Sequence, residues 1–167
     1  MDADTAIRTR RTHKQYAREA VDRATLLELL DLARWAPNHH LTQPWRFRVL
    51  GPQALARLKD VSGEKEAAKL DRAPTLVVAT AQLSGDPLQD EEDLYATGCA
   101  VYIVLLAAHA RGLASYWRTP GVLRTAEGRA ALDLPDDERL VALIHLGRPL
   151  SYPPQKERDA TPVSFLD

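Results

Sequence analysis

The segment from Asp90 to Ala108 constrains the fold more than any other part of this sequence. Acidic residues open it at 90–93, where the helix dipole favours negative charge, and from Leu94 to Ala108 it is apolar on almost every face. A helix of this kind is predicted to be wholly buried, with Cys99 acting as a small apolar side chain. The apolar run is too short to span a bilayer. Because the chain is small, a second subunit could supply much of the burial.

Four segments are predicted to be strands. The segment 45–50 alternates apolar and basic residues, whereas 74–81 is continuously apolar and β-branched, as in a central strand; the other two are 114–118 and 140–147. Helices are expected at 4–11, from Asp22 or Thr25 to Ala36, at 53–70 with a break near 62–63, and at 123–132. Strands flanked by helices indicate an α/β sandwich.

Composition narrows the class of protein. With 167 residues the chain is expected to form one domain, 1–167, ending in a proline-rich arm, 151–167. A net charge of -1 gives no reason to expect nucleic acid or a membrane as partner. One cysteine and no apolar leader favour the cytoplasm. Without a third ligand near His39 and His40, no metal site is expected.

Two polar clusters are candidate binding groups. The loop from Ala36 to Trp45 holds His39 and other donors and acceptors between two prolines, although such side chains could simply satisfy their own backbone. The cluster 10–14 combines basic groups with Thr12, which suits a phosphate; the alternative is a solvated run of charge. Trp35 could stack on a ring system, although simple packing is the expected role, and His145 is expected to be a core or interface histidine with its hydrogen bonds satisfied. His109, at a helix end that suits a protonated imidazole, is expected to be structural.

A third cluster, Trp117-Arg118-Thr119, ends a predicted strand. It offers an aromatic face, a cation and a donor together. The alternative interpretation is one more packed tryptophan beside a surface arginine. Pro120, which follows, has no amide hydrogen to donate.

Together these segments carry a resemblance. The pattern Ala36-Pro37, five residues, then Gln43-Pro44-Trp45 resembles a signature of the nitroreductase family, and Asn38-His39 is similar to its short-chain, YdjA-like branch. Three more segments follow the family order: Arg10-Arg11-Thr12, Trp117-Arg118-Thr119 and Leu146-Gly147-Arg148-Pro149. The resemblance implies a three-layer α+β sandwich with a mixed, largely antiparallel sheet of four to five strands. It also implies a homodimer with a long buried helix at its interface.

The resemblance further implies FMN as cofactor, bound where the subunits meet. Its phosphate and ribityl chain would contact the first basic cluster, with Lys14 near the flavin N1/O2 edge. No catalytic residue stands out, although His39 is the best candidate for a proton donor. The residues that the resemblance places at FMN are Arg10, Arg11, Thr12, Lys14, Pro37, Asn38, His39, Trp117, Arg118, Thr119 and Arg158, the last as a pair with Lys156.

The implied activity is oxidoreduction in ping-pong order. NADH or NADPH would give hydride to flavin N5, and a small acceptor such as a nitroaromatic or a quinone would take the electrons. Two alternatives remain open at this point: an FMN-binding protein that senses or stores the cofactor, and a cofactor-free interaction domain.

Overall fold

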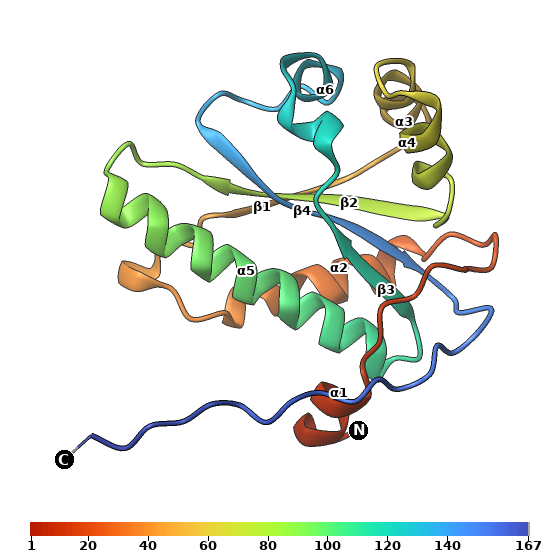
Figure 1. Ribbon diagram of the computed structural model, residues 1–167. Coiled ribbons are helices and arrows are strands. Elements are labelled where there is room, and N and C mark those ends of the chain that lie inside the picture. Colours follow the sequence, from red (N-terminus) through yellow and green to blue (C-terminus); the bar gives the residue numbers. More distant parts are fainter. Residues whose placement is uncertain (167) are drawn as a thin grey trace.

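The computed structural model describes residues 1–166, so that Asp167, the end of the predicted arm, lies outside the described residues. Its centre is a four-stranded sheet in the order β1-β2-β4-β3, with every neighbouring pair antiparallel (Figure 1). The strands are β1 (Trp45–Val49), β2 (Thr75–Gln82), β3 (Ala114–Arg118) and β4 (Glu138–Gly147). All four predicted strands are confirmed. The two continuously apolar ones, β2 and β4, lie in the middle, where both faces are covered.

Helices cover both faces of the sheet, which confirms the predicted sandwich (Figure 1). One layer holds α2 (Arg23–Asp31), the 3-10 turn η1 (Leu32–Trp35) and α5 (Pro87–Ala110). The opposite layer holds α3 (Pro52–Asp60), α4 (Glu64–Leu70), η3 (Gly121–Arg124) and α6 (Ala126–Ala131). The remaining elements are α1 (Ala3–Thr9) and η2 (His39–Leu41), which lie at the periphery.

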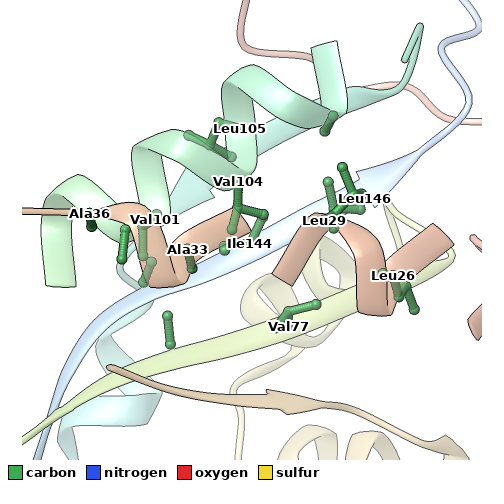
Figure 2. Packing of buried hydrophobic residues seen from close by; sticks show 14 residues of the cluster. Leu26, Leu29, Ala33, Ala36, Val77, Val101, Val104, Leu105, Ile144 and Leu146 are labelled. Atoms are coloured by element: carbon green, nitrogen blue, oxygen red, sulfur yellow. The ribbon is translucent and has the colours of Figure 1, made fainter. Parts of the chain in front are cut away.

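The core beneath α5 joins α2, η1 and α5 to the central strands β2 and β4 (Figure 2). Leu29 of α2, Val104 of α5 and Ile144 of β4 are all fully buried there. Burial of each such side chain stabilises the fold by roughly 1.5–3 kcal/mol. A second cluster, which includes Leu58, Leu70 and Leu143, fills the space on the other face.

The chain after α1 lies along the β3 edge of the sheet. Thr12 forms a parallel bridge with Ser115, and Tyr16 forms an antiparallel bridge with Pro149. The bridge at Thr12 gives the sheet its small parallel component. It also fixes the first basic cluster beside β3.

Helix α5 differs from its prediction at the start and in burial. It begins at Pro87, three residues early, because the Asp86 carboxylate accepts hydrogen bonds from two amides of the first turn. Contrary to the expectation of a run too short to span a bilayer, its 24 residues are by length and composition sufficient to cross a membrane, although its inner side packs on the sheet. The outer side is not buried: Tyr95 is 65% exposed and Cys99 is exposed. The expectation of a wholly buried helix is therefore wrong for a single copy.

The predicted helix 123–132 is two elements. Thr125 has an extended backbone between η3 and α6, and its side chain caps α6 by accepting from the amide of Gly128. At position 128 only glycine fits, because a Cβ would lie 1.9 Å from the carbonyl oxygen of Val122. Glycine thereby lets α6 approach η3 closely.

Three expectations about aromatic side chains are wrong in whole or in part. Trp35 is 76% exposed rather than packed. His145 is fully buried, as predicted, but neither ring nitrogen has a hydrogen-bond partner within residues 1–166. His109 contacts the Thr9 hydroxyl at 2.8 Å, and burial together with nearby positive charge lowers its pKa, so its position does not favour the protonated form.

Candidate functional site

A basic cavity of about 520 Å³ lies between the chain after α1 and the C-terminal arm. Four residues predicted from the first basic cluster line it, together with Arg158 of the arm. Gln15 and Ser151 join the two segments, with the serine hydroxyl 2.9 Å from the glutamine Oε1. The complete lining is Arg10, Arg11, Thr12, Lys14, Gln15, Ser151, Pro153, Pro154, Gln155, Lys156 and Arg158. It contains five cations and no carboxylate.

Arg10 is held in place by contacts with helices α1 and α5. Its amide bonds to the carbonyl of Ala6 at the end of α1, and its guanidinium lies 5.8 Å from the centre of the Tyr102 ring on α5. Its Nε is buried and has no partner in the described part of the chain. A buried donor without an acceptor costs free energy, so a bound anion would relieve this arrangement. The donor set and this free donor both fit a phosphate group.

The neighbouring residues are fixed by the backbone. Arg11 donates to the carbonyls of Arg8 and Arg10 at 2.6 and 2.8 Å. His13 is buried beside the cavity, with Nδ1 3.1 Å from the carbonyl of Ser151, and burial lowers its pKa. The cavity wall is therefore preformed from two segments that lie far apart in the sequence.

The loop after η1 is strained and tied to α5. His40, Leu41 and Gln43 all have positive φ values of 45 to 54°, which is unusual for side chains of this kind. Asn38 holds the loop by accepting from the amide of Gln43 and donating to the carbonyl of Ala36. The alternative considered for this loop, that its polar side chains satisfy its own backbone, thus holds for Asn38.

His39 projects from the loop onto the first turns of α5. Its Nδ1 lies 2.7 Å from Oε2 of Glu92, and its ring stacks on His40 with the centroids 3.8 Å apart. Next to it, Thr42 donates to Asp93 at 2.6 Å. The histidine side chain remains 56% exposed.

The loop and the basic cavity do not meet within one chain. His39 contacts α5 at Glu92, whereas Arg10 contacts it at Tyr102. Ten residues of helix separate these points, about 15 Å along the axis. The structure therefore brings together the predicted residues of the first cluster and the arm, but not Pro37, Asn38 and His39 with them.

The Trp117-Arg118-Thr119 cluster is divided between two faces of the sheet. Trp117 lies toward α5, where its ring is 3.8 Å from the Cβ position at Gly98 and its Nε1 donates to the carbonyl of Val141 at 3.1 Å. Arg118 points to the opposite layer and donates to Glu66 of α4 at 2.5 Å. Thr119 follows the strand and is exposed.

Sequence reasoning missed several members of the site. Tyr102 under Arg10 is, in the sequence, only one more residue of an apolar helix, and Gln15, Ser151 and Gln155 belong to no recognisable pattern. The bridge between Thr12 and Ser115, which aligns these segments, depends on the tertiary fold. Among residues 1–166, no group of three or more His, Cys, Asp or Glu side chains could hold a metal ion.

The structure is an α+β sandwich, with an antiparallel sheet between two helical layers and a basic cavity at the β3 edge of the sheet. Comparison of the sequence with known families identifies the protein family to which this fold belongs. The chain belongs to the nitroreductase family, which it matches over residues 7–67 and 58–148. Among its relatives is YfhC of Bacillus subtilis, provisionally named an NAD(P)H nitroreductase, which is 28% identical over 94% of this chain and 88% of its own length.

Solved structures agree with this assignment. A nitroreductase-like family protein from Bacillus cereus superposes with a TM-score of 0.87 at 25% identity, covering 96% of this chain and 92% of the other. A provisionally assigned nitroreductase from Desulfovibrio desulfuricans, solved in complex with FMN, gives a TM-score of 0.79 at 27% identity, with 93% and 90% covered.

Proposed function

We propose that this chain is an FMN-dependent oxidoreductase that uses NADH or NADPH to reduce a small acceptor such as a nitroaromatic or a quinone. The observation that carries the proposal is the basic cavity, with five cations and the unpartnered Nε of Arg10. Bound FMN would supply the redox chemistry, accepting hydride and passing electrons on in ping-pong order. The FMN complex of the Desulfovibrio relative and the name of YfhC support this assignment.

Each part of the cavity has a role in this proposal. Arg10, Arg11 and Thr12 would hold the FMN phosphate from one side, and Lys156 and Arg158 of the arm from the other. Lys14 would lie toward the flavin N1/O2 edge, where a cation stabilises negative charge on a reduced ring. Trp117 and Thr119 lie farther along the β3 edge and would border the ring, whereas Arg118 supports β3 through Glu66.

We also propose that the working unit is a homodimer with FMN at the subunit interface. Pro37, Asn38 and His39 do not line the basic cavity, and in this proposal His39 of the partner subunit would complete the site. The exposed side of α5 and the extended arm, where Phe165 is 93% exposed, provide apolar surface for a second copy (Figure 1). One domain and a cytoplasmic location remain predictions.

The first experiment is the visible spectrum of the purified protein, followed by titration with FMN and with riboflavin. We expect bound FMN and much weaker riboflavin binding, because riboflavin lacks the phosphate. Arg10→Gln should weaken FMN binding about tenfold or more and leave riboflavin binding unchanged. Equal affinity for both flavins in the wild type would contradict the assigned phosphate site.

Turnover distinguishes the alternatives. A protein that holds FMN but oxidises no NAD(P)H with any quinone or nitroaromatic would be a sensing or storage protein. A protein that binds no flavin at all would be a cofactor-free interaction domain.

A further inference from the structure

A second cavity, of about 440 Å³, is lined by positively charged side chains that have no role in the proposed FMN site. It lies at the start of β4, between η3 and α6 on one side and α5 on the other. Its lining combines three arginines, Arg124, Arg129 and Arg139, with the apolar residues Leu94, Leu123, Leu140 and Val141. No carboxylate lines it. We refer to it as the arginine pocket.

The three guanidinium groups are not neutralised locally. Arg129 donates to the carbonyl of Pro135 at 2.5 Å, a bond that fixes its position but leaves its charge. The side chains of Arg124 and Arg139 make no hydrogen bond or ion pair with the described residues, 1–166. Like charges around one cavity repel one another, so this arrangement favours a bound anion.

The arginine pocket adjoins Trp117. The carbonyl of Val141, a residue of the pocket wall, accepts the hydrogen bond from the Trp117 indole. Leu94, another wall residue, lies one helical turn before Gly98, over which the indole packs. The pocket therefore lies at the end of β3 at which the flavin ring is proposed to be.

This pocket is separate from the cavity assigned to the FMN phosphate. The first basic cluster lies beside Ser115, near the start of β3, whereas the arginine pocket lies near Val141, beyond the pairing of Arg118 with Leu143. A single phosphate cannot serve both sites. The second set of cations is thus available to another ligand.

We propose that the arginine pocket binds the anionic group of a substrate, a carboxylate or phosphate attached to an apolar or aromatic body. The apolar wall would contact the body, and Arg124 and Arg139 would pair with the charge. This inference rests on the proposed function, because it assigns the pocket to a substrate of the flavin site. The anion could belong to the acceptor or to the nicotinamide dinucleotide.

The test compares charged and neutral substrates in the double variant Arg124→Gln/Arg139→Gln. The acceptors are 4-nitrobenzoate and nitrobenzene, and the reductants NADH and NADPH are assayed with a neutral quinone. Arg18→Gln, an exposed arginine away from the pocket, is the matched control. FMN content is measured for each protein. Calorimetric titration with 4-nitrobenzoate and NADP+ tests binding without turnover.

If the acceptor carries the anion, KM for 4-nitrobenzoate rises about tenfold or more, while KM for nitrobenzene changes less than about twofold. If the reductant carries it, KM for the dinucleotides rises instead. Either result supports the inference. Unchanged KM values and unchanged titrations in the double variant would overturn it. If the wild type holds no flavin, the proposed function fails, and the titrations alone decide whether the pocket binds anions.

Discussion

Arg118 and Glu66 form an ion pair that joins strand β3 to helix α4, with the guanidinium Nη2 donating to the carboxylate Oε1 at 2.5 Å. The arginine side chain is 9% exposed and that of the glutamate 21%. Burial by itself would raise the pKa of Glu66, but the hydrogen bond and charge of Arg118 outweigh it and lower the pKa. Helix α4, rich in charged residues, is thus held to the sheet by a largely buried charge pair.

Glu66→Gln should lower the free energy of unfolding by about 1–3 kcal/mol at pH 7, because it leaves the Arg118 charge without its partner. Since the folded pKa of Glu66 lies below its ordinary value of 4.5, its contribution is present above pH 4.5 and is lost as the pH falls through the folded pKa. Denaturant unfolding at pH 7 and pH 3 measures both effects. Glu64→Gln, exposed on the same helix, should change stability by less than about 0.5 kcal/mol.

The buried His145 should make stability depend on pH between about 4 and 6.5, above the range in which Glu66 titrates. Burial, followed by the charge of Arg118, lowers its pKa from 6.5 to about 4. Between these values the unfolded chain binds a proton that the folded chain excludes, so stability falls as the pH drops from 6.5 to 4, by about 3 kcal/mol in all.

His145→Leu should remove this loss. Because neither ring nitrogen has a partner among residues 1–166, an apolar side chain of similar size should also leave stability at pH 7 unchanged or raise it. Thermal unfolding across pH 4 to 7 measures the slope. The exposed His40, changed to Asn, should leave the slope as it is; a wild-type slope retained by His145→Leu would contradict the argument.

Gly128→Ala tests the packing of α6 on η3. The added Cβ would lie 1.9 Å from a backbone oxygen, so the two elements must separate, at a cost of about 2–3 kcal/mol or more. Gly121→Ala, where a Cβ meets nothing within 4 Å, should be neutral or slightly stabilising. Equal melting temperatures for the two variants would show that the contact at Gly128 is not this close.

His39→Ala should lower kcat more than it lowers FMN occupancy, since the imidazole would lie beside the ring rather than at the phosphate. The Glu92 carboxylate at 2.7 Å orients this imidazole, so Glu92→Gln should reduce kcat in the same direction but less. Stopped-flow reduction and reoxidation, measured separately, identify the affected half-reaction. Unchanged kinetics in His39→Ala would dismiss the histidine as a proton donor.

The sequence predicts most of the fold because the strongest signals are local. The strand 114–118 is found with its predicted bounds, and Asp22 caps α2 as expected. The ends of elements that depend on tertiary contacts are harder to predict from the sequence. Strand β4 starts two residues before its predicted start, because Glu138 pairs with Arg48 and Thr80 across the sheet. The three left-handed residues of the loop 39–43 have no sequence signature either.

The candidate site was predictable in part. The first basic cluster and Arg158 do line one cavity, although they are far apart in the sequence. The residues of the Trp117-Arg118-Thr119 cluster are adjacent in sequence but do not form one site, because successive side chains of a strand point to opposite faces of the sheet. Trp117 and Arg118 therefore lie on different sides of the sheet, and a flavin contact by Arg118 remains a prediction.

The separation of His39 from Arg10 along α5 has a genetic consequence if two subunits build each site. A chain altered at Arg10 and a chain altered at His39 would each be impaired as a pure dimer. In a mixed dimer, one site would receive both defects and the other neither. Co-expression of the two impaired forms would therefore raise activity through one intact site in each mixed dimer, as in intragenic complementation.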